Sequence, residues 1–329
     1  MKPELLDVLA CPKCSGSLDC DVRTERDHHE IVEGSLTCTD CKAEYPIIKG
    51  IPRFVGDGNY AGSFGYQWNI FRAEQIDSVN GTALSAKRVF SETGWDASWM
   101  KGKWILDAGC GAGRFVDVVA KTGAKIIGLD ISHAIDAAAK TVPDSPNVHF
   151  VQASIFELPF KPGVLDGVYC IGVVQHTPDP ARAMRSLPIP LKPGGKLALT
   201  AYERRRFTLL NAKYLIRPLT KRLPKALLLG LIRVFMPIAF PITEILFRIP
   251  LLGRAFAFLI PVANYVDEPA LSMRQRYEWA ILDTFDMLSP AFDSPQTEAE
   301  AQTALRASGM TAISRLKNPG LNVVATKAS

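Results

Sequence analysis

An acid and three glycines at alternate positions separate a short apolar run from a helical pattern, and this arrangement constrains the fold more than any other stretch. They are Asp107, Gly109, Gly111 and Gly113. The apolar run at 104–106 predicts a buried strand, and the pattern from Val116 to Lys121 predicts a helix that ends near Gly123. A strand, a glycine turn and a helix form a ligand pocket at the carboxyl edge of a parallel sheet.

The spacing of these glycines distinguishes two classes of nucleotide. The dinucleotide pattern G-x-G-x-x-G/A would require a small residue at Arg114, which does not fit. The observed string D-x-G-x-G-x-G resembles motif I of the class I S-adenosylmethionine (SAM) methyltransferases. This resemblance implies SAM as the cofactor, with the acid and the three glycines around it. The alternative is a tight turn without a ligand.

A second apolar run ends in an acid, Asp130, which lies 21 positions after Gly109. A carboxylate at this distance from the glycine turn can accept hydrogen bonds from both hydroxyls of a ribose. The alternative role is to cap the following helix, but Ser132 could take that role. We therefore expect Asp130 to bind the ribose of the cofactor.

Length and composition limit the class of protein. With 329 residues, 47% hydrophobic and 22% charged, the chain should be globular and larger than one small domain. Its net charge of +5 does not by itself argue for nucleic acid binding. Because the N-terminus has no apolar signal core, we expect a cytoplasmic protein, in which cysteines serve as metal ligands or free thiols.

Two C-x-x-C pairs with 23 residues between them predict a metal site near the N-terminus. They are formed by Cys11, Cys14, Cys38 and Cys41. Four thiolates complete a tetrahedral Zn²⁺ site without an open position, so we expect structural zinc rather than the alternative of redox dithiols. Residues 1–58 resemble a Trm112-like zinc ribbon, with Glu44–Phe54 as its final strand. We expect Cys20 to be a free thiol, and His28 and His29 to lie in a solvated loop.

Residues 59–102 connect this ribbon to the core and include an aromatic-rich stretch. Similar bacterial methyltransferases carry a helix here that folds over the cofactor, with an aromatic side chain near its methionine end. The resemblance makes Tyr66 and Gln67 candidates for contact with cofactor or substrate. The alternative is ordinary packing of the helix against the sheet.

Later motifs resemble the ubiquinone-type methyltransferases. In that group an acid before the string L-P-F, here Leu158–Phe160, holds the adenine amino group. Ser154 stands in its place and can accept a weaker hydrogen bond. The string Q-H-T-P-D-P at 175–180 resembles the group's H-H-T-P-D-P loop, which reaches the transfer site, and L-K-P-G-G follows at 191–195. The resemblance implies further cofactor contacts from Ile131, Ile155 and Gly172.

His176 is the candidate general base of this loop, because an imidazole titrates near neutral pH. The alternative is that its ring makes a hydrogen bond that shapes the loop. Together the motifs imply an α/β, doubly wound, seven-stranded and mostly parallel sheet built from residues 103–202 and 266–329. Its end should be a hairpin of Met310–Leu316 and Leu321–Thr326, with the last strand antiparallel.

Residues 203–265 form an insertion that such a core does not require. The insertion has eleven basic and two acidic residues, a net charge of +9, whereas the rest of the chain carries −4. Its longest charge-free run, Ala255–Val266, has 12 residues. A membrane-spanning helix needs about 20, so we expect no crossing. We also expect prolines to break the segment into short helices, at positions 237, 241, 250 and 261.

Three interpretations of this insertion stay open: a helical lid over the pocket, a basic apolar surface for peripheral contact with a membrane, and an RNA-binding face. RNA-binding faces expose stacking aromatics, whereas the phenylalanines here lie among leucines and isoleucines. This favours the lid, then the membrane surface, and the two are compatible. Downstream, Asp283 and Asp286 are candidate substrate contacts, with capping and surface charge as the alternative.

The sequence therefore predicts a SAM-dependent methyltransferase with a structural zinc ribbon. We expect a small-molecule or lipid-like acceptor, with O-methylation favoured because a catalytic base helps most at a hydroxyl. The first alternative is an RNA base methyltransferase that grips RNA through the ribbon. The second is a non-catalytic SAM-binding scaffold in which the ribbon docks a partner.

Overall fold

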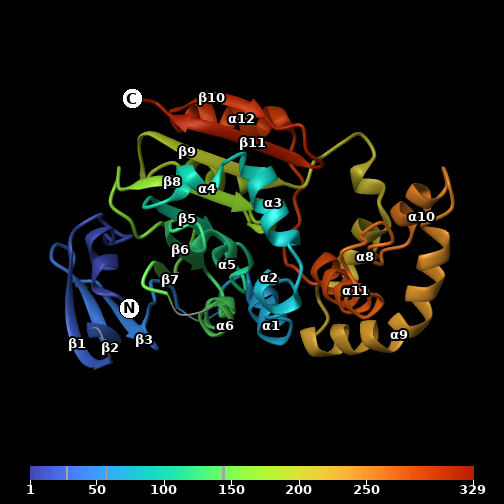
Figure 1. The fold of residues 1–329 in the computed structure, drawn as a ribbon, viewed down its shortest axis with the longest axis horizontal. Coiled ribbons are helices and arrows are strands. Elements are labelled where there is room, and N and C mark those ends of the chain that lie inside the picture. The colour runs from blue at the N-terminus through green and yellow to red at the C-terminus, as the bar shows by residue number, and fades with distance from the viewer. Residues whose placement is uncertain (27–28, 57, 143–144) are drawn as a thin grey trace.

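Seven strands form one sheet through the centre of the molecule (Figure 1). The computed structural model describes residues 1–26, 29–56, 58–142 and 145–329. The strands are β5 (Trp104–Ala108), β6 (Lys125–Asp130), β7 (Val148–Gln152), β8 (Leu165–Ile171), β9 (Leu191–Ala201), β10 (Met310–Arg315) and β11 (Leu321–Lys327). Their order is β10-β11-β9-β8-β5-β6-β7, and β11 runs antiparallel to both of its neighbours. This confirms the predicted mostly parallel sheet with its last strand reversed.

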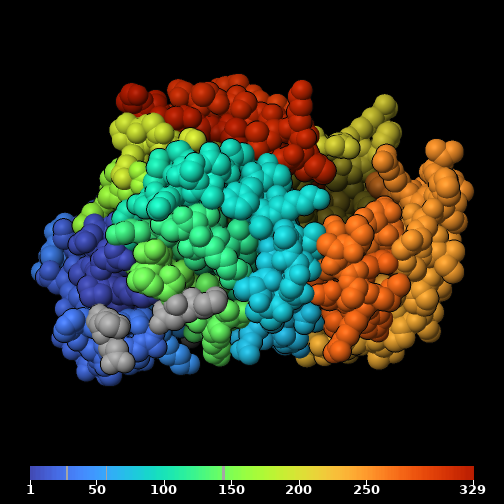
Figure 2. All heavy atoms as spheres, in the orientation of Figure 1, coloured from blue at the N-terminus to red at the C-terminus, as the bar shows by residue number. Residues whose placement is uncertain are grey.

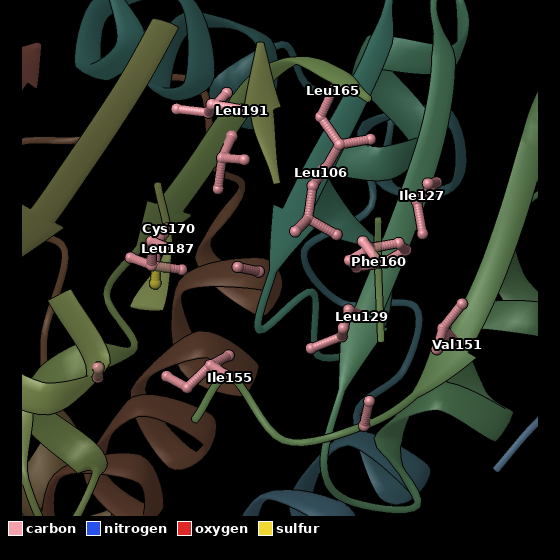
Figure 3. Close-up of a cluster of buried hydrophobic side chains, with 14 of the residues drawn as sticks. Leu106, Ile127, Leu129, Val151, Ile155, Phe160, Leu165, Cys170, Leu187 and Leu191 are labelled. Atoms are coloured by element: carbon pink, nitrogen blue, oxygen red, sulfur yellow. The ribbon is translucent and has the colours of Figure 1, made fainter. Parts of the chain in front are cut away.

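Helices cover both faces of this sheet, as a doubly wound fold requires. On one face Leu106 and Ile127 pack with α7 and α12, and Figure 3 shows both side chains near Leu129, with Leu187 farther along the same cluster beside Cys170. On the other face their chain neighbours pack with α3, α4, α5 and α6. These helices are α3 (Leu84–Thr93), α4 (Ala97–Met100), α5 (Arg114–Ala120), α6 (Ala134–Thr141), α7 (Pro180–Ser186) and α12 (Glu298–Ala307). Because both faces are buried, the central strands are mostly apolar, and most of their charged residues lie near the strand ends.

The N-terminal module, residues 1–58, is a small four-stranded antiparallel sheet, and we call it the zinc module after its predicted metal site. A 3₁₀ turn, η1 (Pro3–Asp7), precedes β1 (Leu18–Arg26), β2 (Glu30–Cys38), β3 (Glu44–Ile48) and β4 (Ile51–Pro52). The predicted single final strand is thus a hairpin, because Lys49 and Gly50 both have positive φ and reverse the chain. His29 is exposed beside Glu25, and His28 lies outside the described residues.

This module closes the β7 edge of the large sheet. The N–H of Phe54 donates to the Gln152 carbonyl at 2.8 Å, and the N–H of Ala10 donates to the Pro159 carbonyl at 3.0 Å. One apolar cluster runs from the module into the sheet. The zinc module and the core therefore share one hydrophobic interior, and an otherwise open sheet edge is covered.

The insertion and the segment after it form a helical layer at the other end of the molecule (Figure 1). It contains η4 (Thr208–Leu210), α8 (Ala212–Thr220), α9 (Lys225–Leu246), α10 (Gly253–Leu259) and α11 (Met273–Leu288). The bridge contributes α1 (Gly62–Ile70) and α2 (Asp77–Asn80). One face of α9 packs on α11 through Ile232, Met236 and Phe240. These helices form a third apolar cluster, separate from those of the sheet.

The helix α9 corrects the predicted break of this segment into short helices. It continues for 22 residues with Pro237 and Pro241 inside it. Both prolines are exposed, so water can hydrate the carbonyls that lose their helical hydrogen bonds. In the described part of the chain α9 alone is long and apolar enough to cross a membrane by length and composition. The expectation that this segment does not cross a membrane stays a prediction.

Candidate functional site

A cavity of about 720 Å³ lies where the parallel strands end. One side, which we call the sheet-edge wall, consists of residues that follow β5, β6, β7 and β8. These are Gly109, Gly111, Asp130, Ile131, Ile155, Gly172 and His176. The opposite side, the helical wall, comes from α10, α11 and the segment between them. It contains Ala257, Ala263, Tyr265, Glu268, Trp279, Asp283, Asp286 and Met287.

The glycine loop forms its part of the sheet-edge wall with bare backbone. Gly109 has a φ of +92°, and a Cβ there would lie 2.5 Å from Val173 Cγ2. Gly111 has a φ of +54°, and its Cβ would lie 3.0 Å from the indole nitrogen of Trp68. Side chains are excluded at both positions by the backbone conformation and by neighbours. Gly113 does not line the cavity; its position faces Val142 at the end of α6.

Asp130 is the acid of the sheet-edge wall. Its Oδ2 accepts from the Gly111 N–H at 3.0 Å, and its Oδ1 accepts from the N–H and the hydroxyl of Ser132 at 2.8 and 2.7 Å. Burial raises its pKa, and these hydrogen bonds oppose the shift. Ser132 itself accepts from the Ala134 N–H and so caps the following turn. Asp130 thus keeps a lone pair on Oδ2 for a ligand in the cavity.

Asp107 lies beneath the loop rather than on the cavity surface. Its side chain is 1% exposed, and burial raises its pKa well above the ordinary value. The Tyr169 phenol beside this carboxyl opposes the rise of its pKa through hydrogen bonding. Because Asp107 lies beneath the loop, its side chain does not line the cavity.

Two features of this wall fit SAM. The first is that Asp130 presents a carboxylate for the ribose. Donors for a carboxylate converge beside Gly172, where a Cβ would lie 3.7 Å from Arg88 Nη2 and 3.9 Å from Gln175 Nε2. Both amide atoms of the buried Gln175 lack a partner in the described part of the chain.

His176 occupies the loop after β8 and lines the cavity. Its Nδ1 lies 3.0 Å from the carbonyl oxygen of Phe292. Because a carbonyl can only accept, Nδ1 carries the proton, and the neutral ring keeps its lone pair on Nε2. The rings of Phe64 and Tyr202 flank the imidazole, with centroid-to-centroid distances of 5.1 and 5.4 Å. The structure therefore contains the loop-shaping hydrogen bond and still leaves Nε2 available as a base.

Two of the three carboxylates of the helical wall, Asp283 and Asp286, come from α11, and the sequence had marked these two as candidate substrate contacts. Burial, followed by the charge of Asp286, raises the pKa of Asp283 to about 7. Asp286 Oδ1 accepts from Gln67 Nε2 at 3.1 Å. Nearby, Arg114 Nη1 donates to Gln75 Oε1 at 2.7 Å, and burial lowers the pKa of this guanidinium to about 9. This wall is polar where it meets the glycine loop.

The bridge helix α1 lines the cavity with aromatic side chains other than Tyr66, the one that the sequence favoured. Phe64 and Trp68, four residues apart on one side of the helix, both line it together with Tyr60. Tyr66 points elsewhere and packs on Phe285, with the ring centroids 6.0 Å apart. The cofactor contact proposed for Tyr66 stays a prediction, and Trp68 is the residue that sequence reasoning missed.

Ser154 also lies outside the cavity lining. Its hydroxyl accepts from the Phe156 N–H at 3.2 Å and so stabilises the turn after β7. The next residue, Ile155, does line the cavity. The predicted hydrogen bond from Ser154 to an adenine amino group stays a prediction.

The four cysteines of the two C-x-x-C pairs come together at the end of the zinc module. Their sulfur atoms all lie within 4.8 Å of one another. Cys11 Sγ is 3.6 Å from Cys41 Sγ, and Cys14 Sγ is 3.4 Å from Cys38 Sγ. Tetrahedral zinc with Zn–S bonds of about 2.3 Å needs sulfur separations near ~3.8 Å. The cluster could therefore hold a zinc ion with little rearrangement, and Cys20 is not part of it.

Two family models match this chain. Residues 106–199 match a methyltransferase domain, and residues 2–50 match the family described as Trm112p-like protein. Both matches confirm resemblances that the motifs had indicated. They also agree with the observed fold, since the first covers the strands from β5 to β9 and the second covers the cysteine module.

Curated relatives match part of the chain. The ubiquinone biosynthesis O-methyltransferase of Coxiella burnetii (strain RSA 493 / Nine Mile phase I) is 31% identical over 128 residues, which cover 37% of this chain and 55% of that protein. The enzyme with the same description from Acinetobacter baumannii (strain AYE) is 31% identical over 133 residues, covering 38% and 56%. The chain thus spans about half the length of the curated relatives it matches.

Solved structures with a similar arrangement include two complexes. The complex of the Haloferax volcanii Trm112 methyltransferase activator with a putative methyltransferase has a TM-score of 0.46 and 14% identity, covering 81% of this chain and 98% of that chain. Human N-acetylserotonin methyltransferase in complex with SAM has a TM-score of 0.45 and 16% identity, covering 84% and 61%.

Proposed function

The chain joins a Trm112p-like domain to a methyltransferase domain, and on this premise we propose that it transfers a methyl group from SAM to a small-molecule or lipid-like acceptor. The observation that carries the proposal is the single cavity between the sheet-edge wall and the helical wall. One side offers the groups that a nucleoside and an amino acid need. The other offers space and polar groups for a second molecule. O-methylation is favoured because relatives over the matched region are described as O-methyltransferases.

The residues of the cavity divide the work of the reaction. Asp130 would hold the ribose hydroxyls, and Arg88 with Gln175 would hold the carboxylate of the methionine part. Bound there, SAM supplies an electrophilic methyl group. His176 Nε2 would take the proton from the acceptor hydroxyl as its oxygen forms the new bond to carbon. The helical wall would exclude water and align the acceptor, which is the main requirement for this displacement.

A transfer assay tests the proposal. The purified full chain is incubated with methyl-tritiated SAM and a fractionated cell extract, with Asp130→Ala as the matched control. We expect label in the small-molecule or lipid fraction with the natural chain and none with the variant. Label in ribosomal or transfer RNA would replace the proposed acceptor class. SAM binding without label in any fraction would support a non-catalytic scaffold instead.

We propose a structural role for zinc at the four cysteines. A closed thiolate set leaves no position for a substrate, and the module shares its apolar interior with the sheet. Removing the metal with a chelator should lower the melting temperature of the full chain, and adding zinc back should restore it. Unchanged melting together with lost transfer activity would contradict this role.

A further inference from the structure

The helix α9 has two apolar stripes, and the chain covers only one of them. The covered stripe contains Leu228, Ile232, Met236 and Phe240, which pack on α11. The second stripe repeats every three or four residues on the opposite side. It consists of Leu227, Leu231, Val234, Phe235, Ile238, Ile242 and Ile245, all exposed. A surface helix of a soluble domain ordinarily places polar residues there.

Exposed apolar side chains are concentrated in the insertion. Of 23 large apolar side chains that are exposed among the described residues, 16 lie within 203–265. The extreme case is Leu251, which is 99% exposed in the turn between α9 and α10. It also has a φ of +67°, a conformation that residues with a Cβ disfavour. Among the residues that the structure describes, no side chain covers this leucine. We call the second stripe together with Leu251 and Leu252 the outer face.

Unpaired positive charge accompanies this apolar surface. Several cations of the insertion are neutralised within the chain, such as Arg248 by Glu244 and Lys213 by Asp293. Five exposed cations have no carboxylate partner in the part of the chain that the structure describes. They are Arg206, Lys221, Arg222, Arg233 and Arg254. The rest of the chain carries a net charge of −4, so this end of the molecule is strongly polarised.

We propose that the outer face docks on an anionic lipid bilayer, with α9 and α10 lying in the membrane interface. Apolar residues beside basic ones are the combination that interfacial helices use, and the unpaired cations complement anionic headgroups. Figure 2 shows these helices, in orange, at the end of the molecule opposite the zinc module, where they would meet a flat surface. A second copy of the chain is a poorer occupant, because it would bring the same cations together.

A transmembrane arrangement of α9 conflicts with its packing. To span a bilayer, the helix would have to leave the apolar cluster that it shares with α11. It would also break the two-pronged ion pair of Arg276 with Glu244, in which Arg276 is buried. The interfacial position keeps both and buries only the stripe that the chain leaves uncovered.

This docking would place the membrane next to the cavity. Ala257 of α10 lines the cavity, and α10 also carries the unpaired Arg254. A lipid-like acceptor would therefore have a short path from the bilayer to the helical wall. The docking itself does not depend on methyl transfer, so its test uses neither SAM nor an acceptor.

Vesicle co-sedimentation of the purified full chain tests the proposal. Vesicles of phosphatidylcholine with phosphatidylglycerol are compared with vesicles of phosphatidylcholine alone. We expect binding to the anionic vesicles that weakens as salt is added. The double variant Arg222→Ala/Arg254→Ala should bind roughly thirtyfold more weakly, whereas the control Lys101→Ala/Lys140→Ala should bind like the natural chain. Lys101 and Lys140 are equally exposed but lie outside the insertion.

The apolar contribution has its own matched pair. Leu251→Asp should bind at least about tenfold more weakly, and Ile189→Asp, at a residue 53% exposed on the methyltransferase core, should change nothing. Both side chains are exposed, so equal melting temperatures will show that the variants are folded. The proposal is overturned if the natural chain does not bind anionic vesicles, or if Leu251→Asp binds them equally well. It is also overturned if light scattering shows a dimer that the Leu251→Asp variant no longer forms. Resistance of the native protein to alkaline carbonate extraction would indicate a spanning helix instead.

Discussion

The two walls of the cavity differ in how their residues are held. On the sheet-edge wall, backbone geometry fixes nearly everything: the glycine loop follows a buried strand, and Asp130 is tied to Gly111 and Ser132. On the helical wall, side chains such as Asp283 and Trp279 project from α11, a helix that packs on the insertion. We infer that the sheet-edge wall recognises the cofactor, which any SAM-dependent methyl transfer uses. The helical wall would recognise the acceptor, which differs from one such protein to another.

Replacing His176 should have the largest effect, and only on turnover. In His176→Asn the amide nitrogen can still donate to the Phe292 carbonyl in place of Nδ1, but the base at Nε2 is gone. We expect kcat to fall by about 10² to 10⁴, the usual contribution of a general base. SAM affinity should stay within about twofold. Unchanged kcat would show that His176 only shapes its loop.

Asp130→Ala should instead act on the cofactor alone. The variant removes the acceptor proposed for a ribose hydroxyl, and it leaves the N–H groups of Gly111 and Ser132 without their partner. We expect SAM affinity, measured by equilibrium dialysis, to fall by about 3 kcal/mol, or roughly a hundredfold. Ser154→Ala provides the comparison, because Ser154 does not line the cavity. An equal loss of SAM affinity in both variants would contradict a role in cofactor binding that belongs to Asp130 and not to Ser154.

The helical wall should set the pH dependence. Since the pKa of Asp283 is raised to about 7, its carboxyl is neutral below that pH and charged above it. If catalysis uses the charged form, kcat/KM should rise about tenfold between pH 6 and 8. Asp283→Asn should flatten this rise, and the exposed Asp267→Asn should preserve it. A fall in activity over the same range would mean that the protonated form is the active one.

Tyr66→Phe should have the smallest effect. Its ring packs on Phe285 in the helical cluster, away from the cavity lining. We expect SAM affinity to change by less than about twofold, because the variant removes only a hydroxyl. Trp68→Leu, at a residue that does line the cavity beside Gly111, should weaken binding more. A larger loss of SAM affinity in Tyr66→Phe than in Trp68→Leu would support the cofactor contact first expected for Tyr66.

Sequence reasoning succeeded where backbone rules govern. The strand–glycine–helix pattern, the position of Asp130 at the end of β6 and the pairing of the cysteines depend on local spacing, so the placement of these residues could be predicted. Their roles in binding SAM and zinc stay predictions. At α1 the resemblance favoured Tyr66, whose cofactor contact stays a prediction, whereas the structure places Phe64 and Trp68, four residues apart, in the cavity lining. That spacing does not say which side of a helix faces a cavity.

The helix pattern of the insertion could not be predicted for a related reason. Pro237 and Pro241 were expected to end helices, but both lie on the exposed side of α9, where water can satisfy the freed carbonyls. Whether a proline breaks a helix thus depends on burial, which local sequence does not reveal. The raised pKa of Asp283 likewise arises from its burial and then from the charge of Asp286, and both depend on long-range packing.

Calorimetric titration of the zinc-loaded full chain with SAM tests the central claim most directly. The account predicts saturable heat with one site per chain, which disappears in Asp130→Ala. It predicts the same site for S-adenosylhomocysteine, the demethylated product. A folded, zinc-loaded chain that gives no heat with either compound would contradict the assignment of the sheet-edge wall to SAM.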